Sequence, residues 1–147
     1  MIRQMTEQDI PDVIELGRRM HSESTNLQSL RFSPQRTAWI ALSAIQSGFA
    51  MVAEKGGQIV GMMAGCVVMP FFSEDIISCD YALYVLPEFR TGMTAIRLAD
   101  EYVAWSRCKG VKLVTVGVTA GIDNAAAIAF YEALGFRQSG SQLMIEV

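Results

Sequence analysis

The sequence predicts an α/β fold in which a mixed sheet carries helices on both faces. The first half holds strand patterns joined by a short turn, which pair antiparallel. The second half holds a strand–loop–helix–strand unit, and a crossover helix of that length joins parallel, right-handed neighbours. With 147 residues, the chain fits one domain, residues 1–147, around a single hydrophobic core.

Capping, turn and periodicity signals set the bounds of each expected element. In the first half, Thr6 with Asp9 resembles a capping box, Ser33 before Pro34 starts a second helix, and Gly48 ends it. The expected order is a strand over 2–5, a helix from Thr6 to about Met20, a polar loop over 21–32, a helix from Ser33 to Gly48 and strands over 49–54 and 58–69.

In the second half, prolines and glycines mark the ends of the elements. Lys55-Gly56-Gly57 is a hairpin signal, Pro70 and Pro87 stop strands, and Gly110 and Gly135 follow helices. The expected elements are a strand over 76–85, a helix over about 92–107, a strand over 111–118, a helix over 124–134 and a last strand over 142–147.

Charge and hydropathy narrow the classes of partner. The net charge is −3 and no basic run occurs, which argues against nucleic acid. The longest nearly apolar run, Ile59 to Phe72, is too short to span a bilayer. The N-terminal residues lack the apolar stretch of a signal peptide, so we expect a cytoplasmic protein with no membrane partner.

Metal and serine-hydrolase chemistry find little support. Cys66, Cys79 and Cys108 are widely spaced, and His21 is the one histidine. A structural zinc site needs four nearby nitrogen or sulfur ligands, so no metal site is expected. Three reduced thiols in the core are the simpler interpretation.

The segment around Pro87 carries the strongest functional signal. A strand ends there, and a short loop leads directly into a helix. A helix N-terminus offers unpaired N–H groups and partial positive charge, so it can bind a pyrophosphate. Gly92, Thr94 and Ala95 allow close approach, and Arg90 adds a forked donor. For the isolated segment, an ordinary turn with a surface arginine is an equally good interpretation.

Two segments together resemble the GCN5-related N-acetyltransferase (GNAT) superfamily. The family's cofactor loop, Arg/Gln-x-x-Gly-x-Gly/Ala, here reads Arg90-Thr91-Gly92-Met93-Thr94-Ala95. Its later motif, Asn-x-x-Ala-x-x-x-Tyr-x-x-x-Gly-Phe, is matched by Asn124, Ala127, Tyr131, Gly135 and Phe136. The resemblance covers essentially the whole chain. It implies a GNAT-like acyl-CoA N-acyltransferase fold, with a mostly antiparallel sheet and one parallel pair formed by the fourth and fifth strands.

One residue departs from the family's pattern. Met93 stands where the cofactor loop usually has glycine. Methionine is tolerable there at negative φ and strained at positive φ, and Gly92 can reshape the loop to compensate. We expect coenzyme A binding to survive this change.

The resemblance also implies a reaction and a set of site residues. A primary amine attacks acetyl-CoA directly, Tyr131 acts as general acid, and the backbone N–H of Leu83 stabilises the oxyanion. The implied cofactor-binding residues are Leu83, Val85, Arg90, Thr91, Gly92, Met93, Thr94, Ala95, Asn124 and Tyr131. A core role for the Tyr131 hydroxyl and an N-cap role for Asn124 are the ordinary alternatives.

The base, the acceptor and the oligomeric state stay open at this level. Asp80, Glu23 and His21 are weak candidates for the general base, and the last two are more simply explained as solvated loop residues. The acceptor is a small amine or a peptide N-terminus, and the apolar surplus allows a homodimer. The competing functions are a non-catalytic acyl-CoA-binding sensor or subunit of the same fold, and an interaction domain that binds no cofactor.

Overall fold

The computed structural model describes residues 1–147 and contains a five-stranded sheet with four α-helices. Two 3-10 turns, η1 (Glu7–Asp9) and η2 (Pro87–Phe89), precede α1 and α3. The strands are β1 (Ile2–Gln4), β2 (Phe49–Lys55), β3 (Gln58–Val68), β4 (Ile77–Val85) and β5 (Leu113–Val114). The helices are α1 (Ile10–Glu23), α2 (Pro34–Ser47), α3 (Thr94–Cys108) and α4 (Asn124–Ala133).

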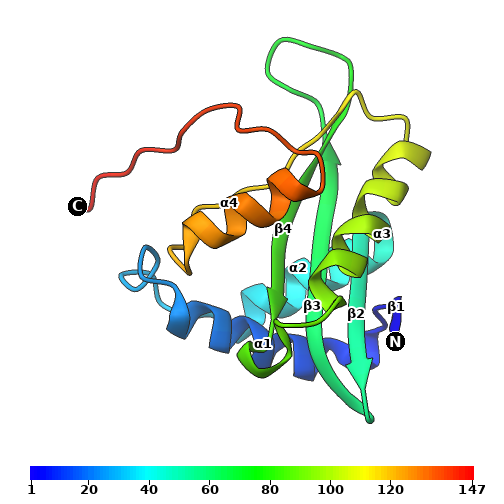
Figure 1. Cartoon of the computed structure of the whole chain (residues 1–147), viewed down its shortest axis with the longest axis vertical. Helices are drawn as coiled ribbons and strands as arrows, with labels where there is room; N and C mark the ends of the chain where they lie inside the picture. The colour runs from blue at the N-terminus through cyan, green and yellow to red at the C-terminus, as the bar shows by residue number, and fades with distance from the viewer.

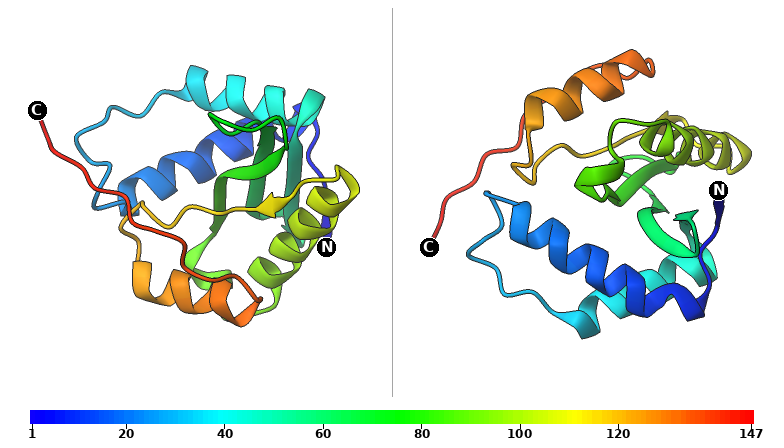
Figure 2. Two further views of the ribbon diagram at one scale, coloured as in Figure 1. Left: turned by 90° about the horizontal axis from the view of Figure 1, so that it is seen from above. Right: turned by 60° about the horizontal axis from the view of Figure 1, so that its bottom comes forward.

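The sheet lies between two layers of helices, as the sequence predicts. The strands follow in the order β1-β2-β3-β4-β5, antiparallel except for the parallel β4/β5 pair. Helices α1 and α2 cover one face, and α3 and α4 lie on the other (Figures 1 and 2). The hairpin between β2 and β3 turns through Gly56 and Gly57, whose φ angles are +57° and +79°, a conformation that glycine adopts without strain.

The core is centred on β3 and the helix that crosses it. Met63, Leu98 and Tyr102 are fully buried, and burying such a side chain contributes about 1.5–3 kcal/mol. Tyr102 from α3 meets Phe49 edge-on at 5.4 Å between ring centroids. Its hydroxyl donates to the Thr115 carbonyl oxygen at 2.9 Å, so the core also holds the chain that follows α3.

An extra residue on β4 interrupts its pairing with β3. Ala64 faces Ala82 but Gly65 faces Asp80, which leaves Tyr81 as a bulge. A Cβ added at Gly65 would lie 2.8 Å from the Cys79 carbonyl oxygen and 2.9 Å from the Tyr102 ring. Only glycine therefore fits at this point of the bulge.

Two predicted strands are corrected. The strand expected over 111–118 is reduced to Leu113–Val114, because the chain leaves β4 after a single short parallel contact. The strand expected over 142–147 is wrong: these residues are exposed and form no strand, and the tail runs away from the sheet (Figure 1). With only two paired residues in β5, the apolar tail has no long edge on which to build a ladder.

The start of α1 is fixed by an ion pair. The Arg3 guanidinium donates to both Asp9 carboxylate oxygens at 2.8 Å and to Glu54 at 2.8 Å. Asp9 also accepts the Thr6 backbone N–H at 2.8 Å, which is the acidic half of the predicted capping box. Hydrogen bonding to Arg3 lowers the pKa of Asp9 to about 2.

Replacing this carboxylate should remove an acid-sensitive part of the stability. Asp9→Asn is expected to lower the free energy of unfolding at pH 7 by about 1–3 kcal/mol, because it removes hydrogen bonds between ions. In the wild type, a lowered pKa means that the Asp9 contribution is complete above pH about 4 and is lost as the pH falls toward 2. Urea unfolding between pH 2 and 7 measures both effects.

The exposed Asp12 in the first turn of α1 provides the control. Asp12→Asn should leave the stability at pH 7 nearly unchanged and keep the wild-type loss in acid. If Asp9→Asn lost as much stability in acid as the wild type does, the Arg3–Asp9 pair would not be the source of that loss.

Candidate active site

Near the end of β4, the backbone N–H and C=O groups of two residues point away from β3. Leu86 N–H donates to the Val60 carbonyl oxygen at 2.9 Å, so Leu86 and Val60 form a hydrogen-bonded pair of the β3/β4 ladder. Bonded and non-bonded pairs alternate along an antiparallel ladder. Leu83 and Val85 fall on the non-bonded pairs with β3, so their N–H and C=O groups point toward the β5 side.

On that side, β5 has already turned away. The last backbone bond between the two strands joins Thr115 N–H to the Ser78 carbonyl oxygen at 3.0 Å. Beyond it, Gly117 N–H donates to the Asp80 carboxylate at 2.8 Å, so a side chain spans the widening gap. Burial raises the pKa of Asp80, partly offset by this bond. The outward backbone groups of Leu83 are thereby left unpaired by β5.

The N-terminus of α3 is free of side-chain caps. Met93 is its N-cap residue and makes no capping hydrogen bond with its side chain. The first helical bond runs from Arg97 N–H to the Met93 carbonyl oxygen at 3.0 Å, so the N–H groups of Thr94 and Ala95 have no acceptor within the helix. Met93 has φ −84°. Methionine is therefore not strained at this position of the cofactor loop, where the family usually has glycine.

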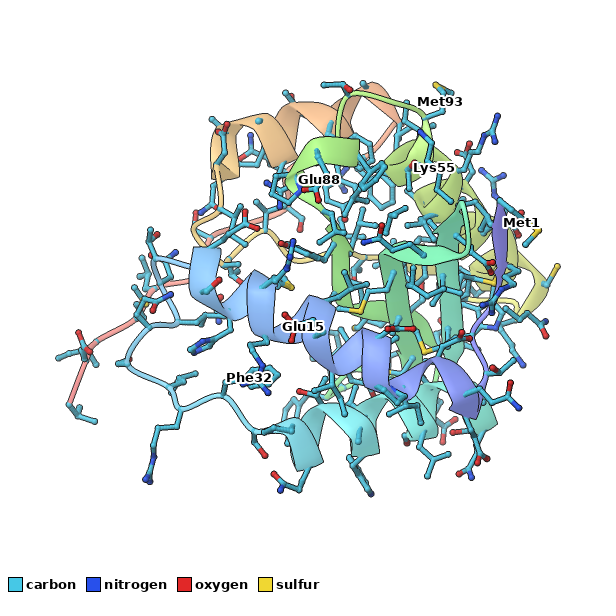
Figure 3. The ribbon with its side chains drawn as sticks, turned by 90° about the horizontal axis from the view of Figure 1, so that it is seen from below. Met1, Glu15, Phe32, Lys55, Glu88 and Met93 are labelled. Atoms are coloured by element: carbon cyan, nitrogen blue, oxygen red, sulfur yellow. The ribbon has the colours of Figure 1, made fainter.

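A hollow of 260 Å³ lies beside this helix tip. Four of its lining residues, Met1, Lys55, Glu88 and Met93, are labelled in Figure 3. The predicted loop residues Thr91, Gly92, Met93 and Thr94 line it, together with the side chains of Arg97 and Glu54. Cations and free amide hydrogens suit an anion, while Glu54 and Glu88 keep the hollow from being uniformly positive.

Arg90 does not join the loop residues in that hollow. Its Nε donates to the Val85 carbonyl oxygen at 2.8 Å, and its terminal nitrogen pairs with the Glu23 carboxylate at 2.9 and 3.1 Å. The Tyr84 hydroxyl donates to the same carboxylate, and the guanidinium lies 5.2 Å from the Tyr84 ring centroid. Burial and the Glu23 carboxylate raise the pKa of Tyr84 to about 12.

Tyr131 lies in a second, larger cleft of 1270 Å³. The side chain is 7% exposed, between Phe130 and Phe136 at 5.0 and 5.4 Å. Its hydroxyl has no hydrogen-bond partner in the chain, and no fully enclosed polar side-chain atom is unpartnered, so the hydroxyl keeps some exposure to solvent. Burial, then the charge of Asp80, raises the pKa of Tyr131, and the phenol is therefore protonated at neutral pH.

Asn124 lines the same cleft, but it does not cap α4. Asp123 is the N-cap residue, at φ +44°, and its side chain accepts the Ala126 N–H at 3.2 Å. The N-cap alternative for Asn124 is thus wrong. The Asn124 side-chain oxygen instead accepts the Gly121 N–H at 3.1 Å, which orients its amide.

The segment after α1 is fastened to the chain before α4, a contact that sequence reasoning missed. Ser24 Oγ donates to Ala120 at 2.6 Å, Thr25 Oγ1 to Gly121 at 2.9 Å, and Asn26 Nδ2 to Thr119 at 2.9 Å, all at carbonyl oxygens. The bonded residues are more than 90 positions apart in sequence. No local pattern signals such a contact.

The three weak base candidates lie in different surroundings. His21 and Glu23 lie in the last turn of α1 rather than in the expected loop, and His21 Nε2 is 2.6 Å from the Leu30 carbonyl oxygen. Asp80 is committed to Gly117 N–H, whereas Glu23 faces Tyr84 and Arg90 at the edge of β4. No group of three His, Cys, Asp or Glu side chains is arranged to hold a metal ion. None of the helices has the length and hydrophobicity needed to cross a membrane.

The structure therefore distributes the predicted site residues over three neighbouring places. Leu83, Val85 and Arg90 meet at the end of β4. Of the loop residues, Thr91 to Thr94 line the hollow at the tip of α3 and Ala95 does not. Asn124 and Tyr131 line the larger cleft between β5 and α4. These places are not joined in one pocket.

The chain matches one family model and is similar to several known acetyltransferases. Residues 13–136 fit the model of the Acetyltransferase (GNAT) family. An uncharacterised N-acetyltransferase of Methanocaldococcus jannaschii is 24% identical over 140 residues, which are 93% of this chain and 60% of that protein. A ribosomal-protein-alanine N-acetyltransferase from Brucella melitensis, 26% identical, gives a TM-score of 0.75 over 95% of this chain and 86% of its own.

A further similar structure is the aminoglycoside N-acetyltransferase AAC(6')-Iy, solved in complex with CoA. It is 16% identical and gives a TM-score of 0.77 over 100% of this chain and 93% of its own. Because the family model covers most of the chain, the chain belongs to the GNAT acetyltransferase family.

The Asp80 carboxylate, which spans the gap between β4 and β5, can be tested with two variants. Asp80→Ala is expected to lower the free energy of unfolding by about 1–3 kcal/mol, because it leaves the Gly117 N–H unpaired. Asp80→Asn keeps an acceptor oxygen and should cost less. Chemical denaturation of both variants measures the difference, and equal losses would show that the bond to Gly117 is not what Asp80 contributes.

The difference in stability between Asp80→Asn and the wild type should also depend on pH. The pKa of Asp80 lies above its unfolded value, so its favourable contribution is present in acid and is lost as the pH rises through the folded pKa. Asp80→Asn removes that loss. Relative to the wild type, the Asn variant should therefore be more stable at pH 7 than at pH 3.

Proposed function

We propose that this chain transfers an acetyl group from acetyl-CoA to a primary amine by direct attack of the amine on the thioester. The observation that carries the proposal is the edge at the end of β4 that β5 leaves unpaired, where only the Arg90 side chain bonds to the Val85 carbonyl oxygen. There, Leu83 and Val85 turn backbone donors and acceptors into the space that β5 has left. An extended pantetheine arm can pair with such an edge as an added strand.

The tip of α3 provides the matching place for the diphosphate. It follows β4 after one short turn, so an arm lying along β4 leads toward it. The free N–H groups of Thr94 and Ala95 and the cations Lys55 and Arg97 favour phosphate oxygens there. The Asn124 amide, oriented by Gly121, lies outside this hollow, in the cleft that also holds Tyr131, and offers the cofactor a donor from there.

The residues near this edge can supply the chemistry of the transfer. As the amine nitrogen bonds to the thioester carbon, the Leu83 N–H stabilises the negative charge that develops on the carbonyl oxygen. The C–S bond then breaks, and the Tyr131 hydroxyl donates its proton to the leaving sulfur. The proton lost by the nitrogen restores the phenol, so the reaction yields an amide and a free thiol.

Tyr131 favours an enzyme over a cofactor sensor of the same fold. A sensor needs the helix tip and the edge of β4, but it has no use for a phenol that is protonated and opens to a cleft. The acceptor remains a small amine or a peptide N-terminus. A screen of polyamines, aminoglycosides, amino acids and peptides with acetyl-CoA, read by thiol release, distinguishes these classes.

Removing the phenolic hydroxyl should slow turnover without weakening cofactor binding. Tyr131→Phe is expected to lower kcat by about 10²–10⁴-fold, the range of general acid catalysis, and to leave the Kd for CoA within about twofold. Thiol release and calorimetry measure the two quantities. Tyr81→Phe, on the exposed bulge of β4, is the control and should keep wild-type turnover.

Cofactor binding can be tested without an acceptor. CoA at about 100 times its Kd should stabilise the folded chain by about 2.7 kcal/mol, which thermal unfolding detects. Stabilisation without thiol release for any amine, and with no effect of Tyr131→Phe, would indicate a sensor. No stabilisation at millimolar CoA would exclude both cofactor-dependent functions.

A further inference from the structure

We propose that Glu23 binds the ammonium group of the acceptor, and that Arg90 covers this carboxylate until the cofactor displaces it. The proposal rests on the proposed function and specifies the acceptor as a primary alkylammonium ion. It concerns a cluster of three side chains, Glu23, Tyr84 and Arg90, which join the end of α1 to the end of β4.

The contacts of Arg90 compete with the proposed position of the cofactor. Its Nε donates to the Val85 carbonyl oxygen at 2.8 Å, and this oxygen points toward the side on which the pantetheine arm would pair. An amide N–H of the arm therefore competes with Arg90 for one acceptor. The diphosphate adds a second attraction, because a guanidinium forms forked bonds with phosphate oxygens.

Displacement of Arg90 would change the state of Glu23. With Arg90 in place, both carboxylate oxygens accept from the guanidinium, at 3.1 and 2.9 Å. Without it, the Tyr84 hydroxyl is the one remaining donor, and it is neutral. The Glu23 side chain is 28% exposed, so the uncovered carboxylate can receive a new cation from solution. Arg19, the other nearby cation, already pairs with Glu15 at 3.8 Å.

The position of Glu23 suits an acceptor amine. Its partner Tyr84 lies on β4 between Leu83, the proposed oxyanion donor, and Val85. The next three residues after Glu23 are fastened to 119–121, in the chain that leads from β5 to α4. An ammonium group held by Glu23 would thus lie close to the thioester, on the side of α1, and it would release one proton to water before its nitrogen attacks.

This arrangement predicts an order of binding. The cofactor binds first because it removes the cation that occupies the carboxylate, and the acceptor binds second. A purely structural ion pair between Arg90 and Glu23 would make no such link between the two substrates. The two interpretations therefore differ in what the loss of the Glu23 charge does to each affinity.

The variant Glu23→Gln distinguishes displacement of Arg90 by the cofactor from a purely structural ion pair. Because the neutral amide holds Arg90 less strongly, the variant should bind CoA about two- to fivefold more tightly, the range expected for a partly exposed ion pair. It should also raise the KM for a primary amine by about tenfold or more at saturating acetyl-CoA. Calorimetry with CoA gives the first value, and thiol release with spermidine, kanamycin and a tripeptide gives the second.

Two further variants guard against indirect effects. Asp12→Asn, on the exposed first turn of α1, removes one carboxylate charge away from the cluster and should leave both values unchanged. Glu23→Asp keeps a carboxylate and should recover most of the affinity for the amine. If Glu23→Gln does not fold, as judged by thermal unfolding, Glu23→Asp and Arg90→Gln are compared instead, and only Arg90→Gln should weaken CoA.

The outcomes are distinguishable. Unchanged or weaker CoA binding by Glu23→Gln would overturn the displacement of Arg90, and an unchanged KM would overturn the role in acceptor binding. If the wild type bound CoA but released thiol with no amine of the full screen, the proposed function would fail and the acceptor role with it. The CoA measurement would still decide whether Glu23 holds Arg90 against the cofactor.

Discussion

The hydrogen bond between the Asp80 carboxylate and the Gly117 N–H is the contact on which the rest of the site depends. It spans the point at which two parallel strands separate, where backbone pairing can no longer hold them. The bulge at Tyr81 contributes from the other side by shifting the pairing of β4 with β3. The core fixes this bulge, because Gly65 lies against the Tyr102 ring with no room for a side chain. The separation is therefore built into the packing of the fold.

Elements governed by local chemistry were predicted well from the sequence. The second helix begins after Ser33, whose side chain accepts the Arg36 N–H, and ends at Gly48, as the capping signals indicate. Elements that need a distant partner were not. The tail over 142–147 has the apolar pattern of a strand, but no long edge is available to it. The position of Arg90 could not be predicted, because its partner Glu23 is 67 residues away in sequence.

The family motif predicts a set of site residues, but it does not predict the contacts that these residues make in the structure. Met93 is accommodated at negative φ, and the tip of α3 is uncapped, as an anion site requires. Arg90, however, is bound to the chain itself, at Val85 and Glu23. A motif specifies which residues meet a ligand, whereas their partners before the ligand arrives depend on neighbours outside the motif.

The fastening of Ser24 and Asn26 to Thr119 and Ala120 has a consequence for how the molecule is made. These partners are 93 to 96 positions apart, so closing that loop comes late in folding, since distant contacts are the slowest to form. On the ribosome, the sheet and the first three helices can assemble while α4 is still unsynthesised. A nascent chain would thus acquire its core well before it acquires the contacts between residues 24–26 and 119–121, and a shortened chain ending before residue 119 would lack those contacts.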